Sequence, residues 1–249
     1  MNRTRKLEKL MTGTLLFLIL SFPANTLFSQ IWLNGYTETG TNNVSEGFYE
    51  GVSGQVSAKF HNFKVQTGGL FYFSNANNPV FSAYKLQLEN IFSAFKIPLT
   101  ITAFYLWKPF SDDLNETNVG ALLSYESKHF GCELGLNTRF YYFNQQAILK
   151  YGFTSSTSTS IWEPVNAMYR VSYYLPVSPK TEFEASITNF DFFQIEQETN
   201  PQIRLGCNYK LNEKMLLYGN LGYLEAGLLN MRVNTFGVFL RAGVVWQIN

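Results

Sequence analysis

The last fifteen residues of the chain, 235–249, read TFGVFLRAGVVWQIN and alternate between two kinds of residue. Every second residue, from Phe236 to Ile248, is apolar or aromatic, whereas the residues between them include glycine, arginine and glutamine. A period of two predicts a β-strand with one apolar face. At about fourteen residues, this strand is far longer than the usual five or six. A long terminal strand with Trp246 near its end is typical of a membrane barrel, where it closes on the first strand because an open edge in lipid leaves backbone groups unpaired.

The first 29 residues resemble an export signal. An apolar run, residues 10–22, follows a positive start formed by Arg3, Arg5, Lys6 and Lys9. Because this run is too short to span a bilayer, we expect cleavage near Ser29 and a single domain over residues 30–249. Loss of the signal, with its four basic residues and one acidic residue, changes the formal charge from +1 to −2. That balance gives no basis for a nucleic-acid partner.

The composition favours a membrane barrel over a soluble domain. Aromatic residues make up 17% of the chain and charged residues only 15%, well below the usual quarter. The mature chain nevertheless contains no run of eighteen apolar residues, so we expect no membrane helix. Many aromatic residues, few charges and an export signal together indicate a barrel in the outer membrane of a diderm bacterium.

Twelve segments with alternating hydrophobicity follow one another along the chain: residues 31–39, 51–60, 63–73, 80–92, 98–108, 117–126, 130–143, 162–175, 181–190, 202–210, 214–224 and 235–249. Short and long connections alternate between them. This order predicts an all-β fold, a closed antiparallel up-and-down transmembrane β-barrel of about 12 strands. Its short turns are expected to face the periplasm, and its long loops the exterior.

Side-chain alternation assigns the two faces. In residues 130–143 the expected outer set includes Cys132 and Leu134, and the inner set includes Glu133 and Arg139. The four tryptophans all fall near segment ends, so we expect them to form two girdles at headgroup level: Trp32 and Trp246 at the periplasmic end, Trp107 and Trp162 at the outer end.

On these patterns the mature chain resembles a bacterial outer-membrane β-barrel protein of about twelve strands and is porin-like. The resemblance covers all of residues 30–249 but includes no specific motif. Porins for acidic oligosaccharides and nucleosides are similar in strand number and are known for narrow, charge-lined lumens, so the resemblance implies a lumen of that kind.

Catalytic and metal sites have weak support in the sequence. Some outer-membrane barrels are lipid hydrolases with a Ser-His pair near the outer leaflet, but the two histidines, His61 and His129, fall at expected periplasmic turns. No Cys/His cluster or phosphate loop is present. We therefore expect no enzyme activity, no metal and no cofactor. Cys132 and Cys207 are expected to be free thiols that face lipid, because strands seven and ten are not neighbours.

Charged residues at inward positions are the most informative candidates. The basic ones lie at mid-height or above, and the acidic ones lie lower. Charge at bilayer depth is tolerated only where it faces water or a partner. Two interpretations stay open: a basic ring that favours anions, or arginines that pair with Glu or Tyr and plug the lumen. The candidates are Lys85, Arg139, Arg170, Arg204 and Arg241, with Glu89, Glu126, Glu133, Glu182 and Glu184.

The favoured function is a narrow passive channel for small solutes, with anions preferred if the basic groups form a constriction. The alternative is a non-conducting barrel that acts through its extracellular loops as a binding or structural surface protein, and a lipid-modifying enzyme is third. A soluble lipocalin-like barrel is fourth. The expected partners are membrane lipid, a small solute if the protein is a channel, and the outer-membrane assembly machinery through the C-terminal strand.

Overall fold

The computed structural model describes residues 30–41, 48–72, 82–109, 114–144, 159–195, 201–224 and 237–248. The expected signal, residues 1–29, and parts of the long loops lie outside these ranges. The described chain forms twelve strands: β1 (Gln30–Thr41), β2 (Phe48–Phe60), β3 (Phe63–Tyr72), β4 (Ser82–Ala94), β5 (Ile97–Pro109), β6 (Leu114–Glu126), β7 (Phe130–Phe143), β8 (Ser160–Pro176), β9 (Thr181–Thr188), β10 (Gln202–Lys210), β11 (Met215–Leu224) and β12 (Gly237–Gln247).

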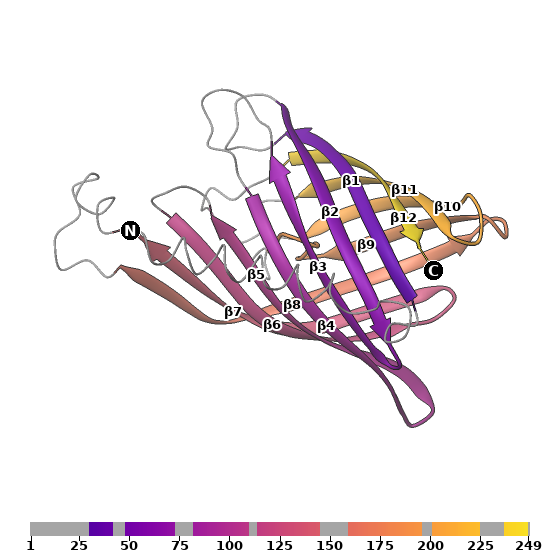
Figure 1. Ribbon diagram of the computed structural model, residues 1–249, viewed down its shortest axis with the longest axis horizontal. Coiled ribbons are helices and arrows are strands. Elements are labelled where there is room, and N and C mark those ends of the chain that lie inside the picture. Colours follow the sequence, from indigo (N-terminus) through magenta and orange to yellow (C-terminus); the bar gives the residue numbers. More distant parts are fainter. Residues whose placement is uncertain are drawn as a thin grey trace.

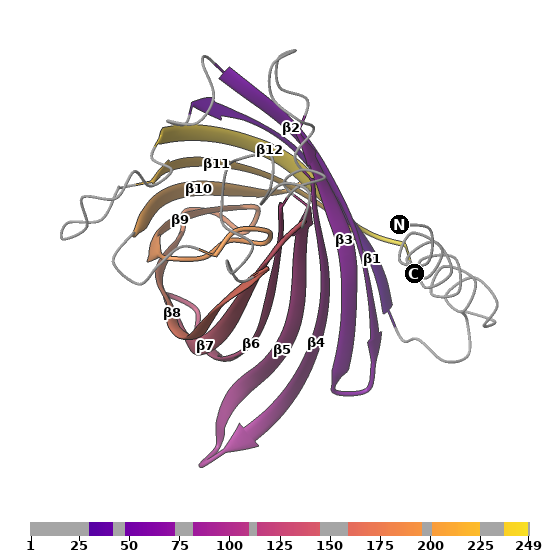
Figure 2. The same ribbon diagram turned by 90° about the vertical axis from the view of Figure 1, so that its left-hand side faces the viewer.

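The strands form one closed antiparallel barrel (Figures 1 and 2). Each strand pairs with its neighbours along the chain, and β12 pairs with β1 to close the ring, from Trp32 opposite Gln247 to Gly40 opposite Phe239. Closure leaves no free sheet edge, so every strand has a hydrogen-bonding neighbour on both sides. The predicted closed up-and-down barrel of about twelve strands is confirmed.

The predicted segments match the strands to within a few residues at most ends, and the short turns lie where they were expected. The β2–β3 turn is His61–Asn62, and the β4–β5 turn is Phe95–Lys96. The end of β9 differs from the prediction, and this difference affects the candidate site. The segment expected over residues 181–190 ends as β9 at Thr188, because the chain turns into the barrel from residue 189 onward.

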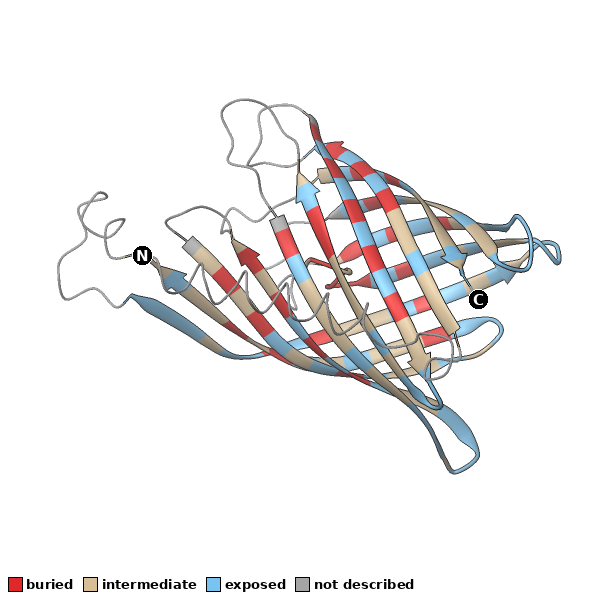
Figure 3. Ribbon diagram, viewed as in Figure 1, coloured by how far each residue is buried: buried red, intermediate tan, exposed pale blue. Residues whose placement is uncertain are grey.

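Exposed and buried residues alternate along the strands (Figure 3). The exposed set is largely apolar, and the buried set is rich in polar and charged groups, as in β10, where Ile203 and Leu205 point outward and Arg204 points inward. Each large apolar side chain left in water forgoes about 1.5–3 kcal/mol, so an exterior of this kind is suited to lipid. Within the described ranges, no helix has the length and apolar character needed to cross a membrane.

Three tryptophans lie on the outer face as predicted. Trp246 is opposite Leu33, Trp107 stacks on Tyr84 with ring centroids 5.5 Å apart, and Trp162 donates to Thr138 Oγ1 at 2.7 Å. Trp32 does not join them. It lies at an inward position of β1, two residues before Asn34 and four before the buried Tyr36, so the prediction that all four belong to outer girdles is wrong for this residue.

The cysteines and histidines lie where they were expected. Cys132 on β7 and Cys207 on β10 occupy outward positions as free, half-buried thiols. His61 belongs to the β2–β3 turn, and His129 lies just before β7, with its Nδ1 3.3 Å from the Tyr174 carbonyl oxygen. Both histidines are therefore at the short-turn end of the barrel.

Candidate functional site

Residues 189–195, which we call the lumenal hairpin, fold back inside the barrel between β9 and β10 (Figure 2). Asn189 starts the reversal, because its side chain accepts from the Tyr169 amide at 2.9 Å and donates to the Ala167 carbonyl at 2.7 Å. Phe190 and Ile195 then form an antiparallel bridge, and the Asp191 amide donates to the Gln194 carbonyl at 2.6 Å. Part of the hairpin backbone is thus paired within the segment, as a connection inside a barrel requires.

The lumenal hairpin is anchored by apolar packing. Phe190, Phe193 and Ile195 are almost fully buried and pack against inward apolar side chains of the wall: Tyr36, Leu70, Ala83, Phe104, Leu106, Leu122 and Met168. These wall residues come from β1, β3, β4, β5, β6 and β8, so the cluster extends across the lumen. In a water-filled lumen these inward apolar groups would be exposed to water, which is unfavourable. The hairpin covers them and removes their apolar surface from water.

The carboxylate of Asp191 lies at the centre of a buried charge cluster. Arg204 Nη2 is 2.8 Å from Asp191 Oδ2, and Arg241 Nη2 donates to the same oxygen at 2.6 Å. Arg241 also pairs with Glu38 across the β1–β12 seam, with its Nε 2.9 Å from Glu38 Oε2. Burial by itself raises the pKa of the Asp191 carboxyl, but the two guanidinium groups outweigh it and hold that pKa well below its usual range.

Two further arginines bind the backbone of the lumenal hairpin. Arg139 Nη2 donates to the Ile195 carbonyl at 2.6 Å, and Arg170 Nη2 donates to the Phe190 carbonyl at 3.2 Å. The Arg170 guanidinium also lies 4.5 Å above the Phe190 ring, a cation–π contact. All four arginines of the predicted basic ring therefore contact one seven-residue segment of the chain itself.

The remaining predicted candidates also occupy inward positions of their strands, and most have partners. Lys85 lies over the Phe104 ring, and Glu89 pairs with Lys64 at 3.3 Å. The others lie toward the short-turn end: Glu133 pairs with Arg170 at 3.1 Å, Glu182 accepts from Asn208 at 3.4 Å, Glu184 accepts from Ser172 at 3.2 Å, and Glu126 lies beside the β6–β7 turn. That these ten residues line a conducting pore remains a prediction.

Four acids that pair with the arginines are absent from the predicted candidates. Asp191 belongs to the connection expected between segments 181–190 and 202–210, Glu38 and Glu116 lie on β1 and β6, and Glu163 on β8 lies 3.4 Å from Arg139 Nη1. The inward period of β1 and β6 could have indicated Glu38 and Glu116. Asp191 carries no periodic signal, because the hairpin is neither strand nor helix.

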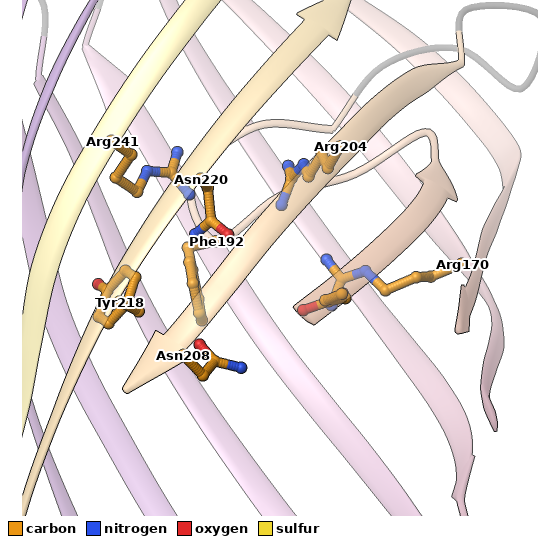
Figure 4. A pocket seen from close by; sticks show the side chains of 8 residues that line it. Arg170, Phe192, Arg204, Asn208, Tyr218, Asn220 and Arg241 are labelled. Carbon is orange, nitrogen blue, oxygen red and sulfur yellow. The ribbon is translucent and has the colours of Figure 1, made fainter. Parts of the chain in front are cut away.

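A cavity of about 200 Å³ lies beside the lumenal hairpin (Figure 4). It extends from the level of the arginines toward the short-turn end of β10 and β11, since Asn208 pairs with Tyr218 two positions below the Gly206–Asn220 pair. Its lining combines three guanidinium groups, two amides, one carboxylate, one phenol and one phenyl ring: Arg170, Arg204, Arg241, Asn208, Asn220, Glu184, Tyr218 and Phe192. Among the described residues, no group of three or more His, Cys, Asp or Glu side chains is placed to hold a metal ion.

Solved structures show the same fold. The translocator domain of the autotransporter NalP from Neisseria meningitidis matches with a TM-score of 0.54 and 14% identity, over 98% of this chain and 97% of that one. The KdgM porin, solved in complex with disordered oligogalacturonate, matches with a TM-score of 0.53 and 8% identity, over 87% and 99%. The COG4313 outer membrane channel from Pseudomonas putida F1 matches with a TM-score of 0.53 and 12% identity, over 89% and 96%.

At these identities the likeness concerns the fold alone. No protein family model matches the sequence, and no curated protein matches it. The chain has the fold of bacterial outer-membrane β-barrels.

Proposed function

We propose that this protein is a narrow passive channel in the outer membrane of a diderm bacterium, and that it passes small anionic solutes. The observation that carries the proposal is the convergence of Arg139, Arg170, Arg204 and Arg241 on one part of the lumen, where together they hold a carboxylate and two backbone carbonyls. Preformed cationic groups at a constriction favour anions.

The comparisons support a channel in two cases of three. One similar structure is a porin solved with oligogalacturonate, which is an acidic sugar chain, and another is an outer membrane channel. The third is a translocator domain, so the fold also serves other roles. The choice of anions therefore rests on the arginines of this chain and not on the likeness.

The test is conductance of the purified, folded protein in a planar bilayer with a salt gradient. We expect discrete steps and a reversal potential that indicates anion preference. The double variant Arg170→Ser with Arg241→Ser should shift the reversal potential toward the value expected for a cation-selective pore. Lys180→Ser, at the exposed β8–β9 turn, removes a positive charge outside the lumen and should leave selectivity unchanged. An unchanged ion preference in the double variant would reject the role of the arginines.

A second function is favoured by the lumenal hairpin. Because Phe190, Phe193 and Ile195 are buried across the lumen, the barrel is also suited to be a non-conducting scaffold that acts through its extracellular loops. Folded protein that never gives conductance steps, in the wild type or in variants of the hairpin, would select this second function.

The other expected partners follow from the same architecture. Membrane lipid surrounds the apolar exterior, and the outer-membrane assembly machinery is proposed to contact the C-terminal strand β12 before it pairs with β1. The expectation that the protein is not an enzyme stays a prediction, and assays of lipid hydrolysis on the purified barrel would test it.

A further inference from the structure

Arg204 and Arg241 form a fork around a single carboxylate. They reach Asp191 from β10 and β12, which are separated by β11, at distances of 2.8 and 2.6 Å. The side chains of Asp191 and Arg241 are more than nine-tenths buried, and that of Arg204 is about nine-tenths buried. Two guanidinium groups on one carboxylate are the arrangement by which proteins recognise carboxylate ligands.

The carboxylate in this fork belongs to a connection and not to the barrel wall. Asp191 lies outside every strand, and its removal from the fork breaks no pairing between strands. Glu38 differs in this respect, because it is fixed in β1 directly opposite Arg241. The fork therefore has one permanent acid and one exchangeable acid.

The cavity next to the fork has room and chemistry for the rest of a ligand. Its volume of about 200 Å³ is large enough for several water molecules. The amides of Asn208 and Asn220 and the hydroxyl of Tyr218 offer donors and acceptors, and the Phe192 ring offers an apolar face (Figure 4). Arg204 Nε is buried and has no hydrogen-bond partner among the described residues, so it is a spare donor at this site.

We propose that the fork and this cavity form a binding site for a small hydroxylated carboxylic acid, and that Asp191 occupies the carboxylate position when no solute is bound. A solute carboxylate replaces that of Asp191, and its hydroxyl groups take the amide and hydroxyl partners in the cavity. The proposal rests on the proposed channel function, because it assigns the class of solute that the lumen selects.

Competition within the chain determines the affinity. A tethered carboxylate acts at an effective concentration on the order of millimolar, so a free acid binds weakly while Asp191 is present. The fork also stays closed without solute, because two buried guanidinium groups left without an anion are costly. Replacement of Asp191 by Asn retains its size and removes its charge, and it should therefore increase the affinity for a free acid.

The test is isothermal titration of the folded full-length mature barrel in detergent, with glucuronate as the probe and glucose as the neutral control. We expect weak glucuronate binding to the wild type and at least tenfold tighter binding to Asp191→Asn. Arg204→Gln in the Asp191→Asn background should lose that gain, and Arg204→Lys, which keeps the charge but not the fork, should lose most of it. Glu213→Gln removes an exposed acid at the β10–β11 turn, outside the lumen, and should change the affinity less than twofold.

Equal glucuronate affinity in wild type and Asp191→Asn would overturn the proposal, as would glucose binding as tight as that of glucuronate. If Arg204→Gln fails to fold, as judged by heat-modifiable migration, Arg204→Lys gives the decisive comparison. Conductance without glucuronate binding would keep the channel and reject this site. Glucuronate binding without conductance would keep the site and reject the channel.

Discussion

Neutralising Asp191 should loosen the lumenal hairpin by a measurable amount. Asp191→Asn leaves Arg204 with Gln202 Oε1 at 2.7 Å, and it leaves Arg241 with Glu38. Breaking a buried ion pair costs about 3–5 kcal/mol, and these remaining partners place the loss at the lower end. A loss of about 3 kcal/mol corresponds to a factor of about 100 in the equilibrium between docked and released hairpin.

Hydrogen exchange measures this equilibrium directly, whether or not the barrel conducts. In the docked state the amides of Phe190, Asp191 and Phe192 all donate to partners within residues 188–194. We expect a peptide covering residues 189–195 to exchange about 100-fold faster in Asp191→Asn, while peptides from the strands keep their rates. The matched control is Glu213→Gln, which neutralises an exposed acid at the β10–β11 turn.

Exchange in the hairpin that is no faster than in the wild type would refute this reasoning. It would mean that apolar burial of Phe190, Phe193 and Ile195 holds the segment by itself. A general rise in exchange, strands included, would instead show that the charge cluster supports the whole barrel.

Three further predictions concern the wall and its turns. Replacing Phe95-Lys96 by Asn-Gly should stabilise the barrel by about 1–2 kcal/mol in urea unfolding, because both residues have positive φ, 53° and 68°, which bulky side chains disfavour. An unchanged free energy of unfolding would mean that these two φ angles carry no cost in the folded barrel. Leu136→Arg, at mid-strand on the lipid face, should destabilise the barrel by about 2–4 kcal/mol in the same assay, well beyond Leu136→Ala. Cys132 and Cys207 should react in vesicles with a membrane-soluble maleimide but not with a charged one, and labelling by the charged reagent would contradict their outward placement.

The barrel could be predicted from the sequence because lipid and the lumen impose opposite demands on alternate residues. In β10, for example, Ile203, Leu205 and Cys207 alternate with Arg204 and Gly206, and the structure places them on the two expected faces. A period of two over the nine residues of this strand leaves little ambiguity about which side chains face the lumen.

The lumenal hairpin could not be predicted in the same way. Its contacts join residues 189–195 to strands throughout the barrel, and no local pattern encodes such distant partners. An indirect signal was present: Leu70, Leu106 and Leu122 occupy inward positions where a wet lumen would favour polar groups. Those residues needed an apolar cover, and the aromatic run after β9 supplies it. Asp191, the counter-ion of Arg204 and Arg241, could not be predicted either, because no local pattern links the hairpin to these distant strands.

The pairing of Arg241 with both Glu38 and Asp191 also constrains the order of folding. Glu38 and Arg241 are 203 residues apart in sequence, and they meet only when β12 reaches β1. Contacts at such a separation carry the highest loop-closure cost and form late. Arg241 can reach Asp191 once β12 pairs with β11, but Glu38, its second acid, is absent until the ring is shut. The hairpin is therefore expected to dock after β12 has paired with its neighbours. Protection of its amides from hydrogen exchange would then mark the completion of barrel assembly.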